Sequence, residues 1–139
     1  MNSLDRVGDE LEIRNLLARL LWEADNAAID DLDAYIACFT PDAQWEMLGD
    51  VRQGHEDLLE GARERRRTSM MGPGTGVLHF LSCTVVDFED DVTGTAKSYI
   101  QAYRNGGRDP QLFLMGQYHD RFSKTDDGWK LAKRTVIFD

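Results

Sequence analysis

Residues 77–103, VLHFLSCTVVDFEDDVTGTAKSYIQAY, decide the fold, because they are typical of two long strands joined by an acidic turn. Both halves are rich in β-branched and aromatic side chains, which favour strands. Two further stretches with the same character follow, each separated from the last by a turn that contains glycine. The predicted strands cover residues 77–87, 92–103, 111–123 and 129–138. Long strands with short connections predict an antiparallel meander.

The first half of the chain is predicted to be mainly helical. Apolar residues recur at three-and-four spacing over residues 7–24, which indicates an amphipathic helix. Asp30 is placed to cap a second short helix, whose apolar side carries Tyr35 and Phe39 and which ends at residues 40–42 because of a proline. A strand over residues 43–48 and a third helix over residues 55–70 complete this half. Helices followed by strands favour an α+β fold with the helices on one face of the sheet.

Composition and charge limit the classes of function. A chain of 139 residues, 42% of them hydrophobic, is expected to form one domain over residues 1–139 without disulfides or metal. Its net charge of −9 repels phosphate backbones and anionic lipids, so nucleic acid and membranes are not expected as partners. The polar N-terminus has no apolar signal segment, and no stretch is apolar enough to span a bilayer. We therefore expect a cytoplasmic protein.

Two further features have structural explanations. Cys38 and Cys83 each lie in an apolar stretch, which predicts small buried residues in a reducing compartment. The arginines at positions 63, 65, 66 and 67 alternate with acids in a predicted helix, which is typical of a solvated face.

Asp25 is the first candidate functional residue. It follows Leu21 by four residues and Leu17 by eight, so it projects from the apolar face of the first helix, near its C-terminal end. A carboxylate aimed at a core needs a partner, because burying it unpaired costs several kcal/mol. The alternative is that Asp25 only helps to form the following turn.

His79 is the second candidate. By strand alternation it shares a face with Val77, Leu81, Cys83 and Val85, so its imidazole is predicted to point into an apolar interior. A histidine in such a place is either a satisfied core residue or a catalytic one. Paired with a carboxylate that fixes one ring nitrogen, it becomes a general base, because the other nitrogen is free to take a proton.

Several segments, taken together, resemble the SnoaL-like proteins of the NTF2-like superfamily. They begin with the acidic, leucine-rich first helix ending in Asp25 and continue, in order, with Asp31-Leu32-Asp33-Ala34-Tyr35, Phe39-Thr40-Pro41-Asp42-Ala43-Gln44-Trp45, Gly54, Leu78-His79-Phe80, Tyr118-His119-Asp120-Arg121-Phe122 and Gly128-Trp129-Lys130-Leu131. The resemblance runs over nearly the whole chain. It implies a cone-shaped, cystatin-like α+β fold, with three N-terminal helices on a curved, mostly antiparallel sheet that encloses a pocket.

The resemblance also implies an activity. Scytalone dehydratase, the bile acid 7α-dehydratase and hexachlorocyclohexane dehydrochlorinase use an aspartate and a histidine at positions that Asp25 and His79 match. A cofactor-independent lyase or isomerase acting on a small apolar, cyclic or aromatic substrate is therefore expected, with His79 abstracting a proton from carbon and Asp25 stabilising the imidazolium. Neither a metal nor an organic cofactor is expected, and the three histidines show no metal-binding spacing.

The group that activates the leaving group stays open in the sequence. Scytalone dehydratase has a tyrosine directly before its aspartate, where this chain has Ala24. The pocket candidates are the tyrosines Tyr35, Tyr99, Tyr103 and Tyr118, together with Trp45, which matches a pocket tryptophan of the dehydrochlorinase; all are equally explained as core aromatics. Asp120 matches the acid/base of polyketide cyclases, although it is more simply explained by a pair with Arg121 or Arg134. Its neighbour His119 must face the opposite side of the strand.

Three other interpretations of the resemblance stay open: an assembly subunit, a ligand-binding protein and a polyketide cyclase. The β subunits of ring-hydroxylating dioxygenases share the fold and serve assembly, and other members only bind ligands, so the fold alone does not choose between catalysis and binding. A polyketide cyclase is an alternative enzyme, whereas the Asp-Arg-Asp arrangement of epoxide hydrolases is not evident in this sequence. Relatives associate through the open sheet face, so a homodimer or homotrimer is expected.

Overall fold

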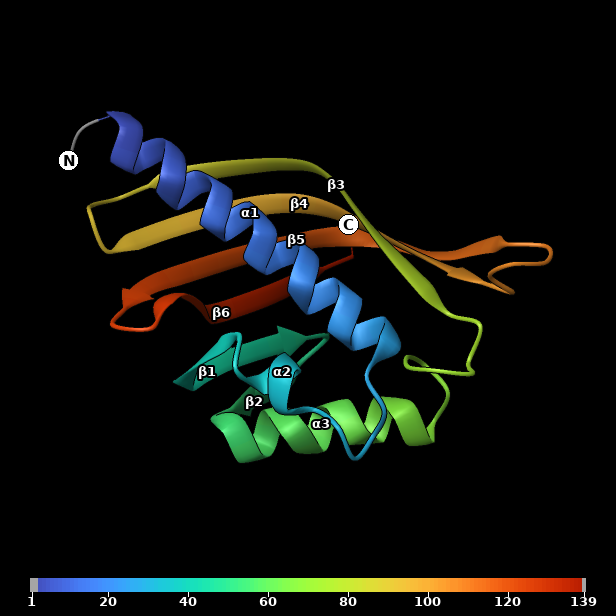
Figure 1. The fold of residues 1–139 in the computed structure, drawn as a ribbon. Coiled ribbons are helices and arrows are strands. Elements are labelled where there is room, and N and C mark those ends of the chain that lie inside the picture. Colours follow the sequence, from blue (N-terminus) through green and yellow to red (C-terminus); the bar gives the residue numbers. More distant parts are fainter. Residues whose placement is uncertain (1–2, 139) are drawn as a thin grey trace.

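A curved six-stranded sheet forms one layer of the structure, and the helices pack against one of its faces (Figure 1). The structure is a computed structural model and describes residues 3–138. In chain order the elements are α1 (Ser3–Asn26), α2 (Asp33–Ile36), β1 (Phe39–Met47), β2 (Asp50–Gln53), α3 (His55–Arg67), β3 (Leu78–Phe88), β4 (Thr93–Arg104), β5 (Gln111–Thr125) and β6 (Gly128–Ile137). This is the predicted α+β architecture.

The strands are arranged in the order β2-β1-β6-β5-β4-β3. β3 to β6 form the predicted antiparallel meander, whereas β1 pairs with β6 in parallel. The sheet is therefore mixed, mostly antiparallel and open, with β2 and β3 at its edges. α1 crosses the sheet diagonally and contacts both β3 and β6 (Figure 1). This crossing brings the end of α1 close to the start of β3.

α1 contributes much of the core, but its buried side differs from the predicted stripe in the first turns. Ile13, Leu17 and Leu20 are almost fully buried, whereas Val7 and Leu11 are exposed. The inward position in the first turns is taken by Asp9, which accepts hydrogen bonds from the Trp129 indole at 2.9 Å and from Lys124 at 3.1 Å. Burial opposes the ionisation of Asp9, but these two donors outweigh it and lower the pKa of the carboxyl. The first turns of α1 are therefore attached to the sheet by the hydrogen bonds of Asp9, and not by the predicted apolar side chains Val7 and Leu11.

β1 begins earlier than predicted, because it gains a parallel partner. Phe39, assigned from the sequence to the second helix, pairs with Leu131 of β6, and the Leu131 amide donates to the Cys38 carbonyl at 2.8 Å. Pro41 is tolerated in the strand because the ladder is irregular between Phe39 and Gln44. The second helix is correspondingly short, and no side chain, Asp30 included, caps its start.

The hairpin β1–β2 was not predicted. Its two turn residues, Leu48 and Gly49, have φ values of 51° and 83°, which suits the tight turn of a two-residue hairpin. Leucine is an unusual residue at positive φ, so the sequence does not indicate a tight turn at Leu48. β2 is short and polar, so it has no pattern typical of a strand. Gly54, at φ 85°, then turns the chain into α3, which ends at Arg67 and not at residue 70.

β3 contains a bulge that changes the predicted orientation of its second half. The register with β4 shifts between Ser82 and Val85, and Cys83 has a φ of 55°. The extra residue reverses the alternation, so Cys83 and Val85 are exposed and do not share the inward face of His79. The prediction of a buried Cys83 is therefore wrong, whereas Cys38 is buried, and burial raises the pKa of its thiol.

Candidate active site

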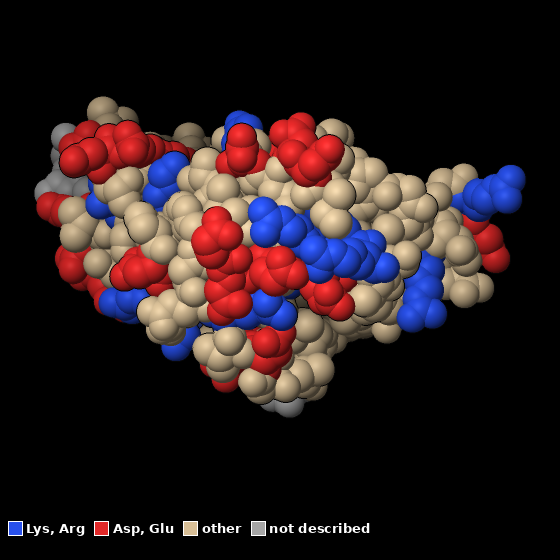
Figure 2. All heavy atoms as spheres, turned by 90° about the horizontal axis from the view of Figure 1, so that it is seen from below, with Lys and Arg blue, Asp and Glu red and all other residues tan. Residues whose placement is uncertain are grey.

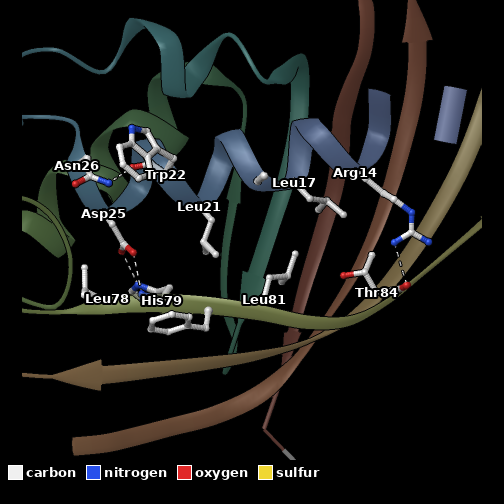
Figure 3. Close-up of a pocket in the computed structure, with 12 residues that line it drawn as sticks. Arg14, Leu17, Leu21, Trp22, Asp25, Asn26, Leu78, His79, Leu81 and Thr84 are labelled. Carbon is white, nitrogen blue, oxygen red and sulfur yellow. Dashed lines mark hydrogen bonds and ion pairs between the residues drawn. The ribbon is translucent and has the colours of Figure 1, made fainter. Parts of the chain in front are cut away.

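Asp25 and His79 form a buried hydrogen-bonded pair between α1 and β3 (Figure 3). The Asp25 Oδ1 lies 2.7 Å from the His79 Nδ1, and the Oδ2 accepts the backbone N–H of His79 at 2.8 Å. The two side chains are only 7% and 9% exposed. An ionised carboxylate can only accept hydrogen bonds, so this contact favours a proton on Nδ1 and leaves Nε2 as the basic nitrogen.

Arg66 of α3 positions Asp25 by holding the end of α1. Its Nε donates to the Ala27 carbonyl at 2.9 Å, and its Nη2 donates to the carbonyls of Glu23 and Ala24 at 3.1 and 3.0 Å. The Glu23 carbonyl also accepts the Ala27 N–H at 2.9 Å, whereas carbonyls in the last turn, such as that of Ala24, have no partner within the helix. A guanidinium at this place binds them and complements the helix dipole. Asp25 lies among these residues, and its position therefore depends on α3.

The arginine cluster of α3 is accordingly divided between two faces. Arg63 and Arg67 pair with Glu60 on the surface, as predicted, and acidic and basic side chains intermingle on the face that Figure 2 shows. Arg65 and Arg66 are half-buried and turn toward the protein. The prediction of a wholly solvated face is therefore wrong for these two residues.

An interior cavity of about 90 Å³ lies beside the pair. It is lined by His79 together with Leu20, Leu21, Ala24, Tyr35, Trp45, Met47, Arg65, Met70, Met71, Phe113, Leu114, Tyr118, Arg134 and Val136. The wall is mainly apolar, with a small number of polar groups, which is the usual character of a small-molecule site. Three of the predicted pocket residues, Tyr35, Trp45 and Tyr118, belong to this wall.

Tyr99 and Asp120 lie elsewhere. Tyr99 is about half exposed at 51% and projects from the sheet face opposite to the core, since its neighbour Ile100 is buried. Asp120 is buried and paired with Arg134, with Nε–Oδ1 and Nη2–Oδ2 distances of 2.8 and 3.0 Å. Arg121, the other predicted partner, pairs with Glu89 on the surface. Asp120 thus acts on the cavity only through Arg134, which is part of the wall.

Arg134 and Tyr118 are stacked in the cavity wall. The Arg134 guanidinium carbon lies 3.8 Å from the centre of the Tyr118 ring. Burial raises the pKa of the Tyr118 hydroxyl, and the Asp120 carboxylate, against the effect of burial, keeps Arg134 charged. The wall therefore offers a hydroxyl that stays protonated and a fixed positive charge. Arg134 was not predicted as a site residue, because its sequence neighbourhood differs little from that of any strand arginine.

Arg65 is the second cavity residue that the sequence did not reveal. Its guanidinium carbon lies 4.8 Å from the centre of the Trp45 ring, and its Nη2 lies 3.5 Å from the Tyr35 hydroxyl. Leu58 and Ala62 lie on the buried face of α3. Arg65 follows Ala62 by three residues, so the helical period places it near the same face. This spacing was the available signal.

A second depression opens on the other side of the pair. This groove of about 400 Å³ runs between α1 and the edge strand β3, and Figure 3 shows the residues that line it. Leu21 and His79 line both the groove and the interior cavity. The Asp25–His79 pair therefore lies in the wall between two spaces of different size.

The other histidines are not part of this site. The His119 Nε2 contacts the Gln117 side chain at 2.9 Å and the His55 Nε2 contacts the Phe39 carbonyl at 3.1 Å. Between residues 3 and 138 no group of three or more metal-binding side chains gathers. Within the same range, no helix combines the length and the apolar character needed to cross a bilayer.

Comparison with known proteins agrees with this architecture. The chain matches the SnoaL-like domain family over residues 5–135. The uncharacterized protein Rv2910c of Mycobacterium tuberculosis is 29% identical over 140 residues, which cover 96% of this chain and 88% of that protein.

Solved structures share the fold at lower identity. An NTF2-like protein of Novosphingobium aromaticivorans has a TM-score of 0.83 at 24% identity, with 98% of this chain and 86% of that chain covered. LinA has a TM-score of 0.80 at 19% identity, with 100% and 91% covered. A candidate scytalone dehydratase from N. aromaticivorans has a TM-score of 0.75 at 17% identity, with 97% and 87% covered. The chain belongs to the SnoaL-like domain family and has its NTF2-like, cystatin-like fold.

Proposed function

We propose that this protein is a cofactor-independent lyase of the dehydratase or dehydrohalogenase type, in which the Asp25–His79 pair acts as the general base. The observation that carries the proposal is the 2.7 Å contact between Asp25 Oδ1 and His79 Nδ1 beside a cavity that His79 also lines. A buried carboxylate and imidazole at the wall of an apolar cavity cost stability, and a purely structural core would not need them.

The proposed reaction is a β-elimination. His79 Nε2 takes a proton from a carbon of the substrate, the electrons of that C–H bond form the new double bond, and the leaving group departs with its own bonding pair. Asp25, which accepts the Nδ1 proton, stabilises the imidazolium that results. No electron donor or acceptor is required, so the step balances without a cofactor.

Departure of the leaving group requires a donor or a positive charge in the wall. Tyr118 and Arg134 supply these in the proposal, because the buried hydroxyl stays protonated and the guanidinium stays charged. Tyr35 offers a second hydroxyl on the same cavity. A hydroxide leaving group accepts a hydrogen bond from Tyr118 as it departs and then takes the proton that His79 removed, which forms water and restores the base; a halide rests against the positive charge.

Two structural neighbours support the reaction class. LinA is a hexachlorocyclohexane dehydrochlorinase, and another neighbour is a candidate scytalone dehydratase. Both names denote eliminations. At 15–19% identity these similarities show the fold alone, so the site geometry, and not the neighbours, carries the proposal.

The test compares variants on a panel of cyclic β-hydroxyketones and γ-hexachlorocyclohexane, with elimination followed by NMR. For any substrate that is turned over, His79→Ala and Asp25→Asn should lower kcat by roughly 10²–10⁴-fold. His119→Ala is the matched control, because His119 lies outside the cavity, and it should retain activity. Unchanged turnover in the two dyad variants would overturn the proposal. Binding without elimination across the panel would favour the ligand-binding alternative.

A further inference from the structure

Arg65 is a cavity cation that lacks a carboxylate partner. None of the ion pairs among residues 3–138 includes it, and its Nε is buried without a hydrogen-bond partner in the protein. Its Nη2 has only the 3.5 Å contact to the Tyr35 hydroxyl, which is at the limit of a hydrogen bond. A buried donor that stays unsatisfied lowers stability, so a group with this geometry suits a bound acceptor.

The carboxylates near the cavity are already paired. Asp25 is bound at both oxygens by His79, and Asp120 is bound at both oxygens by Arg134. Two arginines line the cavity, Arg65 and Arg134. Arg134 is paired with Asp120, whereas Arg65 forms no ion pair with any residue in the described part of the chain.

The neighbouring Arg134 shows what the free edge of Arg65 can bind. Arg134 uses Nε and Nη2 together to hold the two oxygens of Asp120 at 2.8 and 3.0 Å. Of the same two nitrogens in Arg65, Nε has no hydrogen-bond partner in the protein, and Nη2 has only the 3.5 Å contact to the Tyr35 hydroxyl. This edge matches the spacing of a carboxylate. Because Nε is buried, an incoming carboxylate must displace the wall groups that cover it and the Tyr35 contact to Nη2.

The guanidinium is also held in place before any ligand arrives. Trp45 lies against it, with 4.8 Å between Arg65 Cζ and the ring centre, and the Tyr35 hydroxyl contacts Nη2. Trp45 and Tyr35 are themselves buried, at 8% and 6% exposed. A cation fixed by buried aromatic groups loses little side-chain entropy on binding.

We propose that the cavity binds a small carboxylic acid with an apolar body, and that Arg65 takes its carboxylate through Nε and Nη2. The apolar part lies against the leucines, methionines and Phe113 of the wall. The binding of this acid is independent of the proposed function. That the acid is a substrate, from which His79 takes a proton, rests on the proposed function.

The size of the cavity limits the acid. At about 90 Å³ it is smaller than the roughly 150 Å³ that holds benzene in an engineered apolar cavity. Met70 and Met71, which lie in the wall after α3, are unbranched and can repack to admit a ring. Propanoate should therefore fit directly, and benzoate should fit with movement of these methionines.

The test measures binding and so does not depend on turnover. Propanoate and benzoate are titrated against the neutral amides propanamide and benzamide, and the Arg65 Nε–H resonance is assigned by its loss in Arg65→Gln. The acids should shift that resonance and bind at least about tenfold more tightly than the amides. The preference should vanish in Arg65→Gln and persist in Arg63→Gln, whose arginine pairs with Glu60 on the surface.

Several results would overturn the inference. The first is equal affinity for acid and amide in the wild type, and the second is a preference that survives Arg65→Gln. The third is a shift of the Arg65 Nε–H resonance by sodium chloride as large as the shift by the acids. The fourth is no binding of either acid. A nonspecific attraction of anions is not a competing explanation, because the net charge is −9. His79→Ala should keep the acid preference, so failure of the catalytic proposal and failure of this one are distinguishable.

Discussion

Burial of Tyr118 has a consequence for stability at high pH. Burial raises the pKa of its hydroxyl above the usual value of about 10. In the unfolded chain Tyr118 ionises near pH 10, whereas in the folded protein it keeps its proton. The unfolded state therefore binds fewer protons above about pH 10, and the folding stability falls with rising pH until the folded pKa is passed.

We predict that this loss disappears in Tyr118→Phe. The free energy of unfolding, measured in urea between pH 8 and pH 11, should differ from that of the wild type by a constant amount below about pH 10. Above that value the wild type should lose stability faster than the variant. A difference that stays constant through the whole range would show that the hydroxyl ionises equally in both states. The comparison cancels the titration of the other tyrosines and the lysines.

The candidate pair was predictable at the residue scale, because the helical period of α1 and the strand period of β3 each predict an inward side chain, for Asp25 and His79 respectively. Asp25 follows the helical period from Leu17 and Leu21, and His79 follows the strand period with Leu81. Arg65, Arg134 and the exposure of Cys83 were not predictable in the same way. Arginine is common on surfaces, and the bulge at Cys83 requires a positive φ that cysteine rarely adopts.

At the scale of the elements, the contact between α1 and α3 controls the site. Three hydrogen bonds from Arg66 hold two carbonyls at the end of α1, those of Glu23 and Ala24, and the Ala27 carbonyl just beyond it. We predict that Arg66→Ala lowers the free energy of unfolding by about 2 kcal/mol, because three charged hydrogen bonds are lost and the Ala24 and Ala27 carbonyls lose the guanidinium that binds them. Turnover should fall as well, since Asp25 is no longer fixed beside His79.

Arg67→Ala provides the control for this prediction. Arg67 is the next residue of α3, but it pairs only with Glu60 and Glu64 on the surface, so its removal should change stability far less than removal of Arg66 does. Urea denaturation gives the stability, and hydrogen exchange at residues 23–27 reports the end of α1. Equal effects of the two substitutions would mean that Arg66 does not cap the helix.

The elements themselves were predicted well where a local pattern decides them. The four long strands and α1 carry strong periodicity and clear turns, so their existence and approximate bounds followed from the sequence. β2 and the parallel pairing of β1 with β6 did not follow, because both depend on contacts distant in sequence. The start of β1 at Phe39 is one example, since it is set by Leu131.

At the scale of the whole molecule, the sheet face opposite to the helices carries exposed apolar side chains. Phe80 and Met115 are 52% and 59% exposed, and both pair with Gln101 across β4, which places them in one row on one face. Tyr99 and Leu112 extend this outer patch. Exposed apolar surface of this kind marks interaction sites, and we propose that copies of the chain associate through it.

The proposal predicts a homodimer or homotrimer in solution. Light scattering after size exclusion should give a mass of two or three times the 15.8 kDa of the chain. The double variant with Phe80→Glu and Met115→Glu should be monomeric, because buried unpaired carboxylates cost several kcal/mol. Leu4→Glu, at an exposed position of α1, should leave the mass unchanged. A monomeric wild type would contradict the proposal.

The central claim is that Asp25 holds His79 in the tautomer that leaves Nε2 free to act as a base. The most direct measurement is the ¹⁵N spectrum of the imidazole, with the His79 signals assigned by their loss in His79→Ala. In the wild type, neutral His79 should carry its proton on Nδ1, and Asp25→Asn should remove this preference. A proton on Nε2 in the wild type, unchanged by Asp25→Asn, would contradict the account.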